Sequence, residues 1–145
     1  MLIPLLGNNK VQNVFLDDET LFKNDLGSLH DLYGMHIVYS IVIGDKEYIG
    51  STNDFGGRIS THFKNGRSLS QDLYYDMRNS ENDKIIKIVA ICSSNSQRIL
   101  KESEIIKTKR KEIIEKYIGN EKWLLSQQKI ERIVKEHLYN KNLTI

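Results

Sequence analysis

The feature that most constrains the fold is a pair of strand-forming segments joined by a very short turn. Residues 36–43 and 47–50 are rich in β-branched and aromatic side chains, which favour strands. Only Gly44-Asp45-Lys46 separates them, and a connection of this length joins neighbouring antiparallel strands. We therefore expect a tight hairpin around which the remaining elements pack.

The chain after the hairpin predicts four helices and one further strand. The helices are expected at about 55–64, 70–79, 97–117 and 121–138, and the strand at 85–91. Asp54 is the best N-cap for the first of these helices, because its side chain can accept a hydrogen bond from a free amide of the first turn. This order predicts an α+β domain with a small three-stranded antiparallel sheet flanked by helices.

Residues 1–34 are expected to form a short N-terminal extension, and residues 35–145 the main domain. Within the extension, residues 11–16 predict one short strand and residues 20–32 predict a short helix. The sequence allows two roles for the extension: it can cover an edge of the sheet or mediate assembly.

The composition excludes several classes of protein. The single cysteine, Cys92, rules out an internal disulfide and a cysteine-rich zinc site, and it favours a cytoplasmic, intracellular location. No apolar stretch approaches the roughly 20 residues that cross a bilayer, so no membrane partner is expected. The net charge is only +2, but residues 98–136 hold eleven basic and seven acidic residues, a surplus that can contact phosphates.

Two tyrosines of the hairpin and two residues of the following helix are the first candidates for chemistry. Tyr39 and Tyr48 lie on paired strands and can share one face of the sheet. Arg58 and His62 are four residues apart, so they share one face of a helix. An arginine can neutralise charge that develops on a phosphate, and a tyrosine or histidine can take a proton from water. If the helix packs beside the hairpin, the set suits phosphodiester cleavage.

Such a site also needs a carboxylate to hold a divalent metal ion, which would offset charge on the leaving oxygen. Glu102 and Glu104 compete for this role in the long helix. With about 3.6 residues per turn, Glu102 lies on the stripe of Ile99, Ile106 and Ile113, whereas Glu104 points roughly away from it. An inward-facing carboxylate is costly without a partner, so Glu102 is the preferred candidate.

The segment Ile37-Val38-Tyr39, followed by the turn, Tyr48-Ile49-Gly50, Arg58 and His62, resembles the signature of the GIY-YIG nuclease superfamily. Ile37 and Val38 stand where the family usually has glycine and isoleucine, whereas the second motif is intact. Arg58 follows Gly50 by eight residues and His62 follows Arg58 by four, which is the family's spacing. The resemblance covers roughly residues 35–140.

The resemblance implies a DNA endonuclease that hydrolyses phosphodiester bonds with one Mg²⁺ or Mn²⁺ ion. Glu102 would hold the metal, because the family's catalytic glutamate tends to have apolar residues three and four positions later, as Ile105 and Ile106 are here. Arg58 would stabilise the transition state. An asparagine often follows a tyrosine near the end of the family's domain, and Asn140 matches it.

In the same reading the two tyrosines, Tyr39 and Tyr48, would position or deprotonate the attacking water, with His62 as a further participant. Which tyrosine is the base stays open on the sequence. The candidates for the catalytic set are therefore Tyr39, Tyr48, Arg58, His62 and Glu102.

DNA is the partner that the resemblance implies. The densest basic cluster of the chain, with Asn140, supplies the weaker candidates for DNA contact: Lys107, Lys109, Arg110 and Lys111. Cutting of both strands by one small site would favour a homodimer or a higher homo-oligomer. Family members that act as homing enzymes usually carry a separate DNA-binding domain, and the sequence shows none, which favours a phage, mobile-element or restriction-type enzyme.

Two functions of other kinds remain as alternatives. The altered first motif allows a nucleic-acid-binding module that kept the fold and lost the chemistry. A phage protein that acts on a host protein is the other, and it predicts no salt-sensitive binding to DNA.

Overall fold

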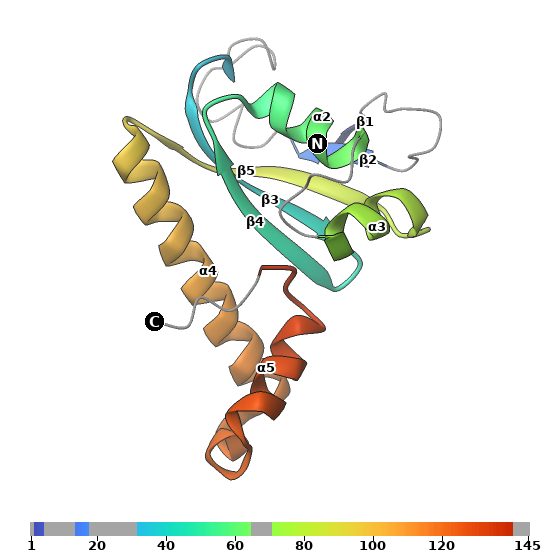
Figure 1. The fold of residues 1–145 in the computed structure, drawn as a ribbon, viewed down its shortest axis with the longest axis vertical. Helices are drawn as coiled ribbons and strands as arrows, with labels where there is room; N and C mark the ends of the chain where they lie inside the picture. Colours follow the sequence, from blue (N-terminus) through green and yellow to red (C-terminus); the bar gives the residue numbers. More distant parts are fainter. Residues whose placement is uncertain (1, 5–13, 18–31, 65–70, 141–145) are drawn as a thin grey trace.

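The computed structural model describes residues 2–4, 14–17, 32–64 and 71–140. Strands and helices follow one another along this part of the chain in a mixed order (Figure 1). The elements are β1 (Leu2–Pro4), β2 (Val14–Asp17), β3 (His36–Ile43), β4 (Lys46–Thr52), α2 (Phe55–Lys64), α3 (Gln71–Asn79), β5 (Lys84–Cys92), α4 (Asn95–Tyr117), the 3-10 helix η2 (Gly119–Leu124) and α5 (Gln127–Lys135).

The hairpin is present as expected. Strands β3 and β4 pair antiparallel from Ile37↔Thr52 to Ile43↔Lys46, with Gly44 and Asp45 as the two residues of the turn. Gly44 has φ of 63°, in the left-handed region that glycine adopts without strain. The expected strand at 85–91 is β5, which pairs antiparallel with the other edge of β3. The α+β class and this three-stranded antiparallel unit are therefore confirmed.

The sheet is nevertheless larger than predicted, with five strands in the order β1-β2-β5-β3-β4. Strand β2 runs parallel to β5 and β1 runs antiparallel to β2, so the sheet is mixed. The prediction of three strands was wrong because the outer edge of β5 still offers unpaired backbone groups. The strand expected at 11–16 forms instead at 14–17 and pairs with residues 84–87, with Val14 and Leu16 buried.

Both added strands come from the segment expected to be an extension, and the division between residues 34 and 35 stays a prediction. The short helix expected at 20–32 falls almost entirely on residues 18–31, which lie outside the described residues.

Helices cover both faces of the sheet (Figure 1). On one face, α2 and α3 pack over the larger core, which includes Ile37, Tyr39, Ile41, Tyr48, Phe55, Ile59, Leu73, Met77, Ile86 and Ile88. On the other face, α4 and α5 pack over a smaller core made by Val38, Ile49, Ile106, Ile130, Val134 and Leu138. Successive residues of a strand point to opposite faces, so the sequence of β3 and β4 assigns each side chain to one core.

A β-bulge lies beside the first tyrosine. Val38 pairs with Ala90 and Tyr39 pairs with Ile88, so Val89 is an extra residue on β5. A bulge bends its strand and increases the local twist, and bulges are frequent next to functional sites. Here the bend is in β5, directly beside the point of β3 that carries Tyr39.

The last predicted helix, 121–138, is interrupted. A 3-10 turn ends at Leu124, and α5 starts afresh after Ser126, whose hydroxyl accepts a hydrogen bond from the Lys129 amide at 3.2 Å. Serine competes well for this N-cap position, which explains the break. No helix of the described residues is long and apolar enough to cross a membrane.

After α5 the chain returns to the free edge of β4. The Glu47 amide donates to the His137 carbonyl at 3.1 Å, and the Tyr139 amide donates to the Glu47 carbonyl at 2.8 Å. Leu138 thereby forms an isolated parallel bridge with Glu47. Residues 137–139 thus cover part of an edge that would otherwise be open.

Candidate functional site

The two tyrosines of the hairpin lie together on the face of the sheet under α2. Tyr39 is 0% exposed and Tyr48 is 3% exposed. Their ring centroids are 6.3 Å apart, and the Tyr39 ring meets the Phe55 ring edge-on at 5.8 Å. Edge-to-face packing of this kind holds rings in a defined orientation. The phenols are therefore fixed by the core and not left to sample solvent.

Gly50 makes room for this arrangement. A Cβ atom added at Gly50 would lie 2.5 Å from both Cζ and Oη of Tyr39, and 2.9 Å from Cε2 of Tyr48. Gly50 is also the cross-strand partner of Tyr39. The Tyr39 phenol thus packs directly against the backbone of Gly50, the glycine of the second motif, and any side chain at this position would displace the phenol.

Replacing Gly50 by alanine is expected to lower the free energy of unfolding by about 1–3 kcal/mol, because the new methyl group overpacks the core around Tyr39. Gly56→Ala is the matched control, since Gly56 is exposed in α2 and its added Cβ would meet nothing within 4 Å. Helix propensity should make that control about 0.5–1 kcal/mol more stable. Urea unfolding measures both, and equal changes would contradict the role given to Gly50.

Helix α2 brings Arg58 to the phenols. The helix begins as predicted, because Asp54 caps it: its Oδ1 accepts from the Gly57 amide at 3.2 Å and its carbonyl accepts from the Arg58 amide at 2.9 Å. The Arg58 guanidinium then hydrogen-bonds to the phenols of both Tyr39 and Tyr48. Burial alone would lower the pKa of Arg58, but these two contacts outweigh it and raise that pKa, so the side chain stays cationic.

Both phenols keep their protons near neutral pH. Burial raises the pKa of Tyr39 far above its ordinary value, with a further increase from Tyr48, and Arg58 only partly opposes this. Burial also raises the pKa of Tyr48. Because a phenol is a hydrogen-bond donor and acceptor, the pair can orient a ligand without being ionised.

Glu102 approaches the second motif from α4. Its charge acts on both phenols and raises their pKa, while its direct contact is with β4, where its Oε2 accepts a hydrogen bond from the Ser51 hydroxyl at 2.6 Å. Ser51 directly follows the second motif on β4. On the stripe that singled out Glu102, Ile106 is 8% exposed but Ile99 is 52% exposed. Glu102 therefore lies at the margin of the core, where a carboxylate is partly sheltered and still reachable.

Glu104 is placed differently. Its side chain is 72% exposed, and its only ion pair among the described residues is a contact with Lys101 at 3.9 Å on the surface of α4. Of the two glutamates, Glu102 is thus the one that contacts β4 and whose charge acts on Tyr39 and Tyr48.

The donor set tells which metal ion the site would suit. Among the residues described, no group of three or more histidine, cysteine or acidic side chains gathers to form a complete cage. Mg²⁺ and Mn²⁺ accept oxygen ligands, and Mg²⁺ is commonly held by one or two carboxylates together with water and substrate phosphates. A single oxygen donor, Glu102, at a margin open to substrate fits that manner of binding.

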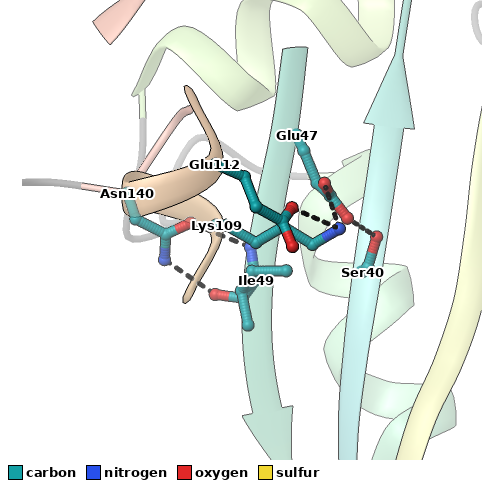
Figure 2. A network of polar contacts seen from close by, with 6 residues as sticks. All are labelled: Ser40, Glu47, Ile49, Lys109, Glu112 and Asn140. Atoms are coloured by element: carbon teal, nitrogen blue, oxygen red, sulfur yellow. Dashed lines mark hydrogen bonds and ion pairs between the residues drawn. The ribbon is translucent and has the colours of Figure 1, made fainter. Parts of the chain in front are cut away.

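The remaining candidate residues lie elsewhere or outside the described side chains. His62 is in α2, one turn after Arg58, but its side chain lies outside the described part of the chain. Both ends of the Asn140 amide bind β4: its Oδ1 accepts from the Ile49 amide and its Nδ2 donates to the Ile49 carbonyl, each at 2.8 Å (Figure 2). Asn140 thus holds the middle residue of the second motif from the strand edge.

The basic cluster of α4 is divided between two surroundings. Lys109 contacts Glu47 at 3.4 Å and Glu112 at 3.9 Å, and Glu47 in turn accepts from Ser40 (Figure 2). Arg110 forms a two-pronged ion pair with Glu131 of α5. Lys107 and Lys111 are exposed on the helix. The sequence could not separate the two paired residues from the two exposed ones, because their partners lie on other elements.

Two further residues lie at the site that were not among its predicted members. The Arg98 Nη1 donates to the Ser51 hydroxyl at 2.9 Å, so Ser51 joins Arg98 to Glu102. The sequence does contain a signal for this pair. Ser51 is adjacent to an intact motif, and Arg98 precedes Glu102 by four residues on a helix, which places both on one face.

Comparison with known families identifies the domain that carries these residues. The model of one family, described as the GIY-YIG catalytic domain, matches residues 34–119. No curated protein and no solved structure matches the chain.

Proposed function

Because the chain belongs to the GIY-YIG family, whose catalytic-domain model matches more than half of it, its activity is of the nuclease type, and we propose that it is a metal-dependent DNA endonuclease. The observation that carries the proposal is the electrostatic coupling of four side chains from four elements, with Arg58 and Glu102 both acting on the two phenols. Tyr39 comes from β3, Tyr48 from β4, Arg58 from α2 and Glu102 from α4.

The altered first motif does not count against this activity. Ile37 and Val38 replace the usual glycine and isoleucine, and both are 0% exposed. Ile37 packs in the larger core and Val38 in the smaller one, so each fills space on its own face of the sheet. The residue of this motif that enters the site is Tyr39, and at this position the chain has the tyrosine that is usual in the family.

Arg58 is the residue proposed to bind the scissile phosphate. Its planar fork suits two oxygens of a phosphate, and its fixed positive charge stabilises the negative charge that grows in the transition state. Without DNA the fork is held by Tyr39 and Tyr48, so it is oriented before substrate arrives. An arginine that is positioned in advance loses little conformational freedom when it binds.

The proton of the attacking water needs a separate acceptor. Tyr39 is unsuited to this task at neutral pH, because burial keeps its phenol protonated. Because Tyr39 is 0% exposed, its role in the proposal is to hold the Arg58 guanidinium in position for the phosphate. Burial raises the pKa of Tyr48 as well, so proton acceptance falls to His62, because an imidazole ordinarily titrates near neutral pH.

Glu102 is the proposed ligand for Mg²⁺ or Mn²⁺, and the ion, when bound, supplies positive charge next to the leaving oxygen. The protein's own contribution is to hold one carboxylate oxygen in place through Ser51 and to leave the margin of the core open to a phosphate. DNA contacts by Lys107 and Lys111, an intracellular site of action, a phage or mobile-element origin and assembly into a homodimer or higher homo-oligomer remain parts of the proposal.

Supercoiled plasmid incubated with the purified protein tests the function. We expect relaxed or linear product with Mg²⁺ or Mn²⁺ and none when EDTA removes the ion, because the transition-state charge is then left uncompensated. Single-stranded and double-stranded RNA of equal length serve as controls for substrate class. Salt-sensitive DNA binding without cleavage under any divalent metal would favour a binding module, and neither binding nor cleavage would favour action on a protein.

A further inference from the structure

A chain of hydrogen bonds ends on the glutamate of the site. Arg98 Nη1 donates to the Ser51 hydroxyl at 2.9 Å, and that hydroxyl donates to Glu102 Oε2 at 2.6 Å. Arg98 also donates from Nη2 to Asn95 Oδ1. A serine hydroxyl has one proton, so accepting from Arg98 leaves its single donor for Glu102. The direction of the chain is therefore fixed, from the guanidinium to the carboxylate.

The arrangement favours one orientation of the carboxylate. A donor that itself receives a hydrogen bond from a cation is polarised and binds its acceptor more strongly. Oε2 of Glu102 is thereby held by the strand, while the other oxygen, Oε1, has no described protein partner. Without Ser51 the glutamate side chain would have three rotatable bonds free at the margin of the core.

The position of Arg98 costs free energy, because one of its donors is left without a described partner. Its Nε atom is buried and has no hydrogen-bond partner among the described residues. A buried donor without a partner costs free energy, so the position that lets Nη1 and Nη2 donate leaves the Nε donor unsatisfied. What this position does achieve is a contact with Ser51 from the same helix that carries Glu102.

We propose that Ser51, supported by Arg98, is a positioning residue that orients the Glu102 carboxylate for a divalent cation. This inference rests on the proposed function, because it takes Glu102 as the ligand of Mg²⁺ or Mn²⁺. Groups that hydrogen-bond to a metal ligand typically change metal affinity by about 10- to 100-fold when removed. Ser51 would thus set the concentration of metal that the enzyme needs, and only secondarily the rate at saturation.

The test compares Ser51→Ala with Ser51→Thr in the full chain. Mn²⁺ is titrated into each protein without DNA, and the paramagnetic broadening of the amide signals of residues 51 and 102 is followed by NMR. Ser51→Ala should need about 10-fold more Mn²⁺ for half-maximal broadening. Ser51→Thr keeps a hydroxyl and should stay close to the wild type, which a loss of packing alone would not explain.

Plasmid cleavage over a range of Mg²⁺ concentrations gives the second readout. The half-saturating Mg²⁺ concentration of Ser51→Ala should rise by a similar factor, with the rate at saturating Mg²⁺ within about threefold of the wild type. Ser96→Ala is the control for loss of a hydroxyl on the exposed first turn of α4 and should change neither value.

The outcomes separate the two proposals. If the wild type binds Mn²⁺ and cleaves but Ser51→Ala has unchanged metal requirements, the positioning role is wrong and the nuclease stands. If Ser51→Thr loses affinity as strongly as Ser51→Ala, the hydroxyl is not what matters and the proposal is also overturned. If the wild type neither cleaves DNA nor shows Mn²⁺ broadening at residue 102, it is the proposed function that fails.

Discussion

Glu102→Gln is expected to abolish metal-dependent cleavage, with a fall in the single-turnover rate of at least roughly 100- to 1,000-fold. Glutamine has the same shape and its carbonyl oxygen can still accept from Ser51, so the fold should be kept. It lacks the negative charge that holds a cation, and a loss of this size is typical when one electrostatic partner of a transition state is removed. Cleavage at saturating Mg²⁺ and thermal unfolding, measured side by side, check the rate and the fold.

Glu104→Gln is the matched control for this prediction. It makes the same chemical change two residues away, on a side chain that is 72% exposed and pairs only with Lys101 among the described residues. Its rate should lie within about twofold of the wild type, since exposed ion pairs contribute little. If Glu104→Gln lost cleavage activity while Glu102→Gln kept it, the metal ligand would have been assigned to the wrong glutamate.

Arg58→Lys is expected to lower the cleavage rate by roughly 100-fold while keeping the positive charge. The guanidinium meets two phenols at once, and a lysine ammonium is a point charge that cannot reproduce a planar fork. Loss of one oriented donor to the transition state costs about 100- to 1,000-fold in comparable sites. The measurement is the single-turnover rate on plasmid at saturating Mg²⁺, with the affinity for uncut DNA determined separately.

Arg132→Lys provides the comparison, because Arg132 is exposed on α5 and far from the hairpin in the chain. It should leave the rate unchanged. If Arg58→Lys cleaves as fast as this control, the fork geometry is irrelevant, and Arg58 would serve only to neutralise charge. A fall in DNA affinity without any fall in the rate would place Arg58 in ground-state binding.

The hairpin and the start of α2 could be predicted because their signals are local. A two-residue turn at Gly44 and Asp45 admits one pairing of its flanking strands, and Asp54 caps the helix that follows it. Helical periodicity also separated Glu102 from Glu104 by direction. These features depend on residues a few positions apart, where backbone geometry leaves few choices.

What could not be predicted depends on pairs distant in sequence. Nothing in Val14–Asp17 indicates a parallel partner near residue 85. Parallel strands are joined by a long connection and not by a short turn, so the sequence carries no local signal for their pairing. The engagement of Asn140 with Ile49 and the contact of Ser51 with Glu102 likewise join separate elements. The adjacency of Ser51 to the motif is visible in the sequence, but its contact with Glu102 exists only because α4 lies alongside β4.

The attachment of Asn140 to Ile49 has a consequence for the order of folding. The two residues are separated by 91 positions, yet the Asn140 side chain binds both the amide and the carbonyl of Ile49, the residue next to Tyr48. Contacts across such a separation require closure of a long loop, and they tend to form late. The hairpin can pair early from its local turn, but the outer edge of its second strand is completed only after α4 and α5 have docked. A partly folded chain would therefore already contain the tyrosine pair while its second strand was still loose, so the last step of folding is also the step that makes the site rigid.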